Sequence, residues 1–263
     1  MNIMRCAACA LLVISLQAGA AEGNVPRMPN GKPDFNGTWE NGGGIDFVRP
    51  ETRPDGSLCI SGCAPPPPPG TLAPGRLPPD RPKYKPEFQA QVKDLTARQQ
   101  RTDPVLRCQP PGVPRIGPPD KIIQTAREAV FLYEDVSGPF FRIVPLTPGV
   151  KRIDDSQSYL GDAQGRWDGD VLVVETGNFN DLSWLTDDGS FHTTDLKVTE
   201  RLTRTPEGIF YEATADDPAV LAEPWVLRPR VLTVAEAEMS EPAPCADQDL
   251  AHMQDDSYHS NPR

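Results

Sequence analysis

The chain has 263 residues, 31 of them proline, and a formal net charge of −11 at pH 7. A surface this acidic repels phosphate backbones and anionic lipid headgroups, so the sequence disfavours nucleic-acid binding and adsorption to membranes. With 24% charged and 38% hydrophobic residues, the composition is that of a folded domain and not of a disordered chain.

The first twenty residues have the pattern of an export signal. Arg5 gives a short positive region, residues 7–16 form an apolar run too short to cross a bilayer, and residues 18–20 are the small residues that a signal peptidase accepts. We therefore predict a signal peptide over residues 1–20 and a soluble mature chain, periplasmic or extracellular. Membrane insertion after cleavage is not expected, because no later stretch approaches the roughly 20 apolar residues of a spanning helix.

Residues 21–103 are predicted to form an arm rich in proline and glycine that contains one helix. As far as about Asp80 this composition favours extended chain with little regular structure. The helix is predicted over residues 86–101, because Pro86 suits a first helical position and apolar residues recur after it at helical spacing.

From Lys121 onward the sequence predicts antiparallel β-structure. Short runs rich in β-branched and aromatic residues, separated by turn residues, occupy 122–125, 130–134 and 140–146. Residues 165–175 predict a hairpin that turns at Asp168-Gly169, since tight primed turns need positive φ.

The C-terminal third continues this β pattern. Residues 197–204 and 209–215 predict a second hairpin, and residues 225–234 predict one further strand, at a sheet edge because of Pro229. About seven or eight strands at hairpin spacing predict a mainly β fold over residues 104–246. We expect an antiparallel meander closed as a barrel or a strongly curved sheet, lipocalin-like in outline, followed by an acidic flexible tail over residues 247–263.

Four cysteines remain after the predicted cleavage: Cys59, Cys63, Cys108 and Cys245. An even set in an exported chain predicts two disulfides, although four cysteines allow three pairings. Ser61-Gly62 lets the chain turn tightly, so we favour Cys59 with Cys63, which leaves Cys108 with Cys245. A zinc site made from the same thiols is the alternative, but their spacing matches no standard zinc finger or ribbon.

Residues 161–181 read GDAQGRWDGDVLVVETGNFND, and His192 is followed by LKVTER at residues 196–201. These two segments resemble the sequences of a large family of exported bacterial proteins of unassigned function, whose recurring motifs are close to GDxxGRWxGDxLVVxTxxFND and HxxxLxVxER. Residues 108–115 are similar to the CxPPGxPR element of the same family. The resemblance implies export and this fold unit, and it transfers no reaction.

Glu200 shares one face of its predicted strand with apolar residues, so it is predicted to point into the interior. An interior carboxylate must find a cation or several donors, or else stay protonated with a raised pKa. It is either the partner of an arginine such as Arg142, in a structural ion pair, or a general acid or base that lines a pocket.

His192 is the only histidine before the C-terminal tail, and Asp195 is close enough in sequence to orient its ring. It is either a hydrogen-bonded structural residue or a proton-transfer group that works with Glu200. Arg142, Trp167, Tyr211 and Asp195 are the candidate ligand-binding residues.

The sequence gives no sign of a metal or cofactor site. Oxygen-bearing residues between 168 and 181 could bind calcium, but they do not follow the EF-hand spacing and also suit turns. The dinucleotide, zincin and α/β-hydrolase fingerprints are missing from the sequence. We therefore expect no metal and no cofactor.

Three functions remain open. We favour an exported protein that binds a small apolar or aromatic molecule in the pocket of a β-barrel or curved sheet. The first alternative is a cofactor-independent lyase, isomerase or hydrolase that uses Glu200 and His192 as an acid–base pair. The second is a structural or interaction protein of the cell envelope, with the proline-rich arm as its interaction segment.

Overall fold

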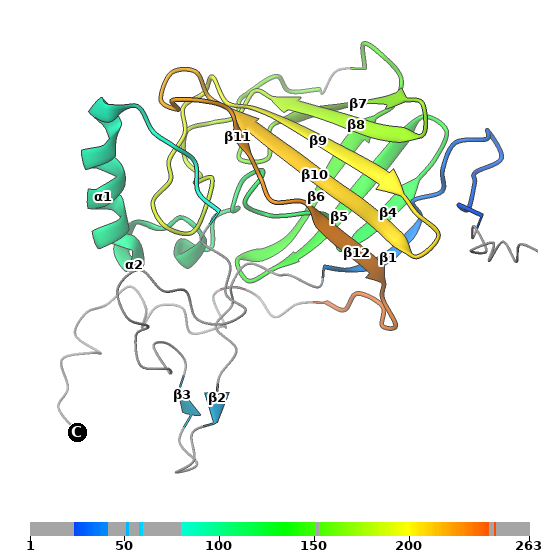
Figure 1. The fold of residues 1–263 in the computed structure, drawn as a ribbon, viewed down its shortest axis with the longest axis horizontal. Coiled ribbons are helices and arrows are strands. Elements are labelled where there is room, and N and C mark those ends of the chain that lie inside the picture. Colours follow the sequence, from blue (N-terminus) through cyan, green and yellow to red (C-terminus); the bar gives the residue numbers. More distant parts are fainter. Residues whose placement is uncertain are drawn as a thin grey trace, which may run out of the picture.

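The computed structural model describes residues 24–41, 51–52, 58–59, 80–150, 153–241 and 245. Its main feature is one ten-stranded antiparallel sheet that curves into a nearly closed barrel (Figure 1). The mainly β, barrel-like fold expected from the sequence is thereby confirmed. The predicted signal peptide over 1–20 and the tail over 247–263 lie outside the described residues.

The ten strands of the barrel are β1 (Gly37–Asn41), β4 (Lys121–Gln124), β5 (Glu128–Asp135), β6 (Gly138–Pro145), β7 (Asp162–Asp168), β8 (Val171–Gly177), β9 (Lys197–Arg204), β10 (Gly208–Asp216), β11 (Trp225–Val226) and β12 (Arg230–Val234). A separate pair is formed by β2 (Glu51–Thr52) and β3 (Leu58–Cys59).

The helical segment runs from a single 3-10 turn, Pro86–Phe88, through α1 (Gln89–Ala97) to α2 (Gln99–Thr102). This confirms the helix predicted over 86–101, with a break between α1 and α2. A second 3-10 turn, Val105–Arg107, follows. No helix in the described part of the chain is long and apolar enough to cross a membrane.

The strand order is β6-β5-β4-β1-β12-β10-β9-β8-β7, with β11 paired to β10. Two meanders, β4 to β6 and β7 to β10, are therefore joined through β1 and β12. The placement of β1 corrects the predicted domain boundary, because residues 37–41 of the proline-rich arm belong to the barrel. The physical reason is apolar burial, since Phe35 and Trp39 both lie in the core.

Two local predictions need correction. The β7–β8 hairpin pairs Asp168 with Val171, so its turn residues are Gly169-Asp170, one position later than expected. Gly169 has φ +60° and Asp170 does not have a positive φ, which is the pattern of a type II′ turn. The single edge strand predicted over 225–234 is also wrong: β12 pairs with both β1 and β10. The chain carries Pro229 in the gap before β12, where its missing amide hydrogen costs no ladder bond.

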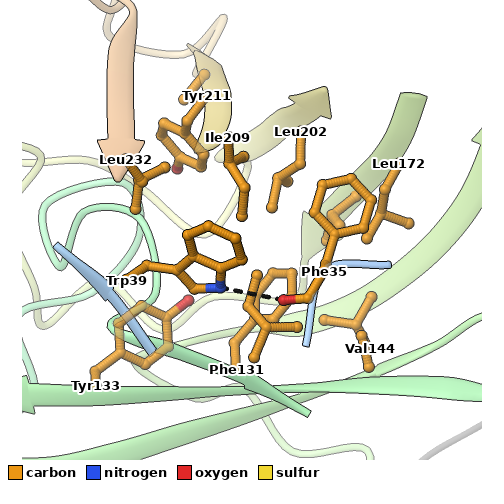
Figure 2. Packing of buried hydrophobic residues seen from close by; sticks show 14 residues of the cluster. Phe35, Trp39, Phe131, Tyr133, Val144, Leu172, Leu202, Ile209, Tyr211 and Leu232 are labelled. Atoms are coloured by element: carbon orange, nitrogen blue, oxygen red, sulfur yellow. Dashed lines mark hydrogen bonds between the residues drawn. The ribbon is translucent and has the colours of Figure 1, made fainter. Parts of the chain in front are cut away.

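One apolar cluster lies inside the barrel, around Trp39. Figure 2 shows this side chain surrounded by Phe131 and Tyr133 of β5, Ile209 and Tyr211 of β10, and Leu232 of β12. The indole Nε1 donates to the carbonyl oxygen of Phe35 at 3.1 Å, and the guanidinium of Arg204 lies 4.9 Å from the indole ring centre. The N-terminal segment thus packs inside the barrel and does not merely wrap around it.

A second apolar cluster lies where β9 begins and β10 ends, under the loop that joins β8 to β9. Helix α1 packs against this loop (Figure 1): the Thr96 hydroxyl donates to the carbonyl of Asp188 at 2.6 Å. Cys108 and Cys245 form a disulfide with an S–S distance of 2.05 Å, which confirms that predicted pairing. Of the predicted Cys59–Cys63 bridge, Cys63 lies outside the described residues.

Candidate functional site

Five buried polar side chains meet inside the barrel, each from a different strand. We call this set the interior polar layer: Tyr133 of β5, Arg142 of β6, Thr176 of β8, Glu200 of β9 and Tyr211 of β10. Each side chain points inward because side chains alternate along a strand, and each shares its face with a buried apolar residue two positions away: Phe131, Val144, Val174, Val198 and Ile209.

A bidentate ion pair holds the interior polar layer together. Arg142 Nη1 and Nη2 donate to Glu200 Oε1 and Oε2 at 3.1 and 2.6 Å. The Tyr211 hydroxyl donates to Glu200 Oε1 at 2.9 Å. The guanidinium also donates to the Tyr133 hydroxyl at 3.1 Å and to Thr176 Oγ1 at 2.7 Å. The expectation that Glu200 points inward is confirmed, and of its two alternative roles the structure shows the ion pair with Arg142.

The layer is deeply buried, with side-chain exposure of 2% for Arg142 and 0% for Glu200. Burial acts to lower the pKa of Arg142, but the Glu200 carboxylate and the Tyr133 hydroxyl outweigh it, so the pKa is raised. Burial raises the pKa of Tyr133 and of Tyr211. The two phenols therefore stay protonated at neutral pH, and the layer as a whole contains one positive and one negative charge.

One buried nitrogen of the layer has no hydrogen-bond partner among the described residues. Arg142 Nε is buried and meets no hydrogen-bond acceptor in the part of the chain that the structure describes. The guanidinium carbon lies 5.8 Å from the centre of the Phe131 ring. Buried donors without a partner are rare in folded proteins, and an ordered water or a bound molecule is a common explanation.

His192 belongs to a different polar group, in the loop between β8 and β9. Its Nε2 lies 2.8 Å from Ser183 Oγ, and its Nδ1 lies 2.9 Å from the carbonyl oxygen of Thr193. The ring is thus oriented by Thr193 and not by Asp195, which is exposed to solvent. The polar partners of Glu200 are Arg142 and Tyr211, so among the described residues the two candidate proton-transfer groups share no hydrogen-bond partner.

Trp167, a candidate for ligand binding, lies away from both polar groups. Its ring packs at 6.1 Å from the ring of Phe35, and Lys32 Nζ lies 5.3 Å from its centre. The N-terminal segment therefore covers this tryptophan. Of the candidate residues, the structure brings together Arg142, Glu200 and Tyr211 and places the others elsewhere.

The oxygen-bearing residues weighed as calcium ligands are used within the protein. Asp168 accepts from Arg201 at 3.2 Å, and Asp170 accepts two bonds from Arg27 at 3.0 and 2.6 Å. Within the described ranges, no group of three or more His, Cys, Asp or Glu residues is placed to hold a metal ion.

Sequence reasoning missed Tyr133, Thr176 and Ser183. Tyr133 fits the inward alternation of the strand predicted over 130–134, which could have identified it, whereas Thr176 lies one residue beyond the hairpin predicted over 165–175. The signal for Ser183 is its position nine residues before His192, between two motifs of the family resemblance.

No protein-family model, curated protein or solved structure matches the chain. The resemblance to exported bacterial proteins stays a prediction.

Proposed function

We propose that this is an exported binding protein whose barrel holds a small, neutral, largely apolar or aromatic molecule at the interior polar layer. The observation that carries the proposal is the buried Nε–H of Arg142, which has no acceptor among the described residues. A ligand that places an oxygen there would complete the hydrogen bonds of the guanidinium.

The energetics of the layer favour a role beyond stability. Moving a carboxylate and a guanidinium out of water costs several kcal/mol for each ion, and well-packed apolar residues in their place are often equally stable or better. A fully buried Arg142–Glu200 pair is therefore a poor way to stabilise a barrel. It is a good way to hold one donor in a fixed direction inside an apolar interior.

The charges of the layer favour a neutral ligand. Arg142 and Glu200 already balance one another, so a charged ligand would bring an unpaired charge into the interior at high cost. The surroundings are apolar and aromatic, with Phe131 beside the guanidinium. Ala213, directly opposite Glu200 across the β9–β10 pair, adds only a methyl group to the interior. A ketone, ester or ether with an aromatic or aliphatic body fits this chemistry.

Export is supported by the N-terminal pattern and by the Cys108–Cys245 disulfide, because disulfides persist mainly in oxidising compartments.

The acid–base alternative receives less support. Glu200 contacts Arg142 and Tyr211 of the interior polar layer, whereas His192 contacts Ser183 and Thr193. These contacts do not bring Glu200 and His192 into one site.

A second candidate function, an interaction protein, is favoured by one observation on the outside of the barrel. Ile123 of β4 and Phe141 and Ile143 of β6 are 45%, 63% and 51% exposed, on the two strands that flank β5. Val130 of β5 pairs with both isoleucines, so the apolar surface is continuous across three strands. Exposed apolar patches of this kind mark contact surfaces.

The experiment measures binding of Prodan, a neutral naphthalene ketone whose emission shifts to shorter wavelength in apolar surroundings. We expect saturable binding with one site per chain, and weaker binding of 2-dimethylaminonaphthalene, which lacks the ketone. Arg142→Lys removes Nε but keeps the charge, and should weaken Prodan binding by about tenfold through the lost hydrogen bond.

Phe141→Ser is the matched control, because it changes the next residue of β6 on the outer face. We expect it to leave Prodan binding unchanged. A loss of binding in Phe141→Ser with none in Arg142→Lys would place the probe on the outer surface and favour the interaction protein. Absence of saturable binding by either probe would count against the binding function.

A further inference from the structure

Ser183 and His192 form a polar pair that the proposed binding function does not use. Ser183 Oγ lies 2.8 Å from His192 Nε2, and His192 Nδ1 lies 2.9 Å from the carbonyl oxygen of Thr193. A carbonyl oxygen can only accept, so Nδ1 carries the ring proton and Nε2 accepts the hydrogen bond of the serine hydroxyl. This is the arrangement of a nucleophilic serine beside its general base.

The imidazole is held in this orientation from several sides. Thr193 donates to the buried carboxylate of Asp217 from its amide at 2.6 Å and from its hydroxyl at 3.1 Å. The ring of Phe179 meets the imidazole edge-on with 6.0 Å between the centres. The carbonyl of Thr193 thus occupies the place that a carboxylate holds in the triads of serine hydrolases.

The electrostatics fit a base and not an acid. Burial lowers the pKa of His192 below that of an ordinary histidine, although its bond to Thr193 and the charge of Asp217 partly offset this. The imidazole is therefore neutral near pH 7 and able to take the proton of Ser183.

We propose that Ser183 is a nucleophile toward esters of small carboxylic acids, with His192 as its general base. Ser183 Oγ attacks the ester carbonyl carbon while its proton passes to His192 Nε2. The bond from that carbon to the alcohol oxygen breaks, and His192 returns the proton to the departing alcohol, which leaves the acyl group on Ser183. His192 then takes a proton from a water that attacks the acyl carbon, the bond from that carbon to Ser183 Oγ breaks, and His192 returns the proton to Ser183 Oγ, which releases the acid and restores the serine.

The small size of the acyl group follows from Gly112. A Cβ at this glycine would lie 2.2 Å from Ser183 Oγ, so the backbone of Gly112 lies directly over the nucleophile. Ser183 is 1% exposed, whereas Asp181 and Leu182 just before it are exposed. The loop therefore reaches the surface one residue from the serine. An ester would reach Ser183 only if the Gly112 segment moved aside, so we expect acylation to be slow and selective for short acyl chains.

The test incubates the full mature chain with p-nitrophenyl acetate and follows release of p-nitrophenolate, intact mass and the modified peptide. We expect one acetyl group per chain, located on Ser183. The rate should rise with pH through a transition below about 6.5, the ordinary pKa of histidine, because only the neutral imidazole accepts the proton.

Three variants assign the roles. Ser183→Ala should abolish the adduct, and His192→Gln should slow acylation by about a hundredfold or more, since an amide cannot take the proton. Ser190→Ala is the matched control and should react at the wild-type rate: Ser190 is equally buried, but its hydroxyl donates to Asp188 at 2.7 Å.

Three results would overturn the proposal: no acetyl adduct on the wild-type chain, an adduct on another residue, or an unchanged rate in His192→Gln. The first two results come from the wild-type chain, so they test the proposal even if a variant fails to fold.

Discussion

Replacing Glu200 by Gln removes one charge from the interior polar layer while nearly keeping its shape. Arg142 then keeps its positive charge in the core, with the hydroxyls of Tyr133 and Thr176 and a neutral amide as its partners. Leaving a buried charge without its counter-ion costs about 3–5 kcal/mol. In a folded unit of this size 1 kcal/mol shifts Tm by about 2–4 °C, so we expect Tm to fall by about 6–20 °C.

The assay is thermal and urea unfolding followed by circular dichroism, with Glu175→Gln as the control. Glu175 lies on the neighbouring strand β8 and pairs with Arg166 at 3.4 Å, but its side chain is 56% exposed. Exposed pairs contribute about 0–1 kcal/mol, so the control should lose little.

A double variant separates the charge from the packing. Changing both Arg142 and Glu200 to Met removes the pair without leaving an unpaired charge, and should be close to wild type in stability or above it. The reasoning would be refuted if Glu200→Gln unfolded with the same free energy as Glu175→Gln. The guanidinium would then not depend on its carboxylate partner.

Three further predictions concern the rest of the barrel. Replacing Cys108 and Cys245 by Ser should lower the free energy of unfolding by about 4–5 kcal/mol, because the bridge joins positions 137 residues apart; equal urea midpoints would contradict this. The lowered pKa of His192 means that its contribution to stability is complete above about pH 6.5 and is lost as the pH falls through the folded pKa. His192→Gln should therefore make the free energy of unfolding less dependent on pH below about 6.5. The same pH dependence in the wild-type chain and the variant would contradict this prediction. Gly208→Ala would place a Cβ 1.9 Å from the carbonyl oxygen of Leu232 in β12, so we expect the free energy of unfolding in urea to fall by at least about 2 kcal/mol. Gly177→Ala is the control and should cost much less, because the space around Gly177 is open. Similar losses in the two variants would show that the β10–β12 contact is not tight.

Much of the interior could be predicted because it depends on local alternation. Glu200 sits between Val198 and Leu202 on one face of its strand, and this pattern alone places a carboxylate inside. Such a carboxylate needs a cation, and Arg142 lies on a strand with the same alternation. The cost of a buried charge thus made the pair with Arg142 one of two alternatives for Glu200, without knowledge of the register.

The neighbours of each strand could not be predicted in the same way. Alternation tells which face a side chain occupies but not which strand lies beside it, so the entry of β1 between β4 and β12 was missed. The same limit hid Thr176 of β8, which reaches Arg142 of β6 only through the closure of the barrel.

The pairing of Ser183 with His192 was hidden for a different reason. Both residues lie in a loop outside the strands, and a loop conformation follows from its packing against other segments. Here Gly112 packs against Ser183, and Asp217 fixes Thr193 beside the imidazole. These contacts come from segments far away in sequence, which no local pattern encodes.

The most direct test of the binding proposal is a nuclear magnetic resonance measurement of the Arg142 Nε–H group, assigned by its loss in Arg142→Lys. This buried proton should exchange slowly with water, and its nitrogen and proton resonances should move when Prodan binds, because the ketone oxygen becomes the missing acceptor. If Prodan saturates its site while the Arg142 Nε–H resonance stays where it was, the ligand does not meet the interior polar layer and the central claim is wrong.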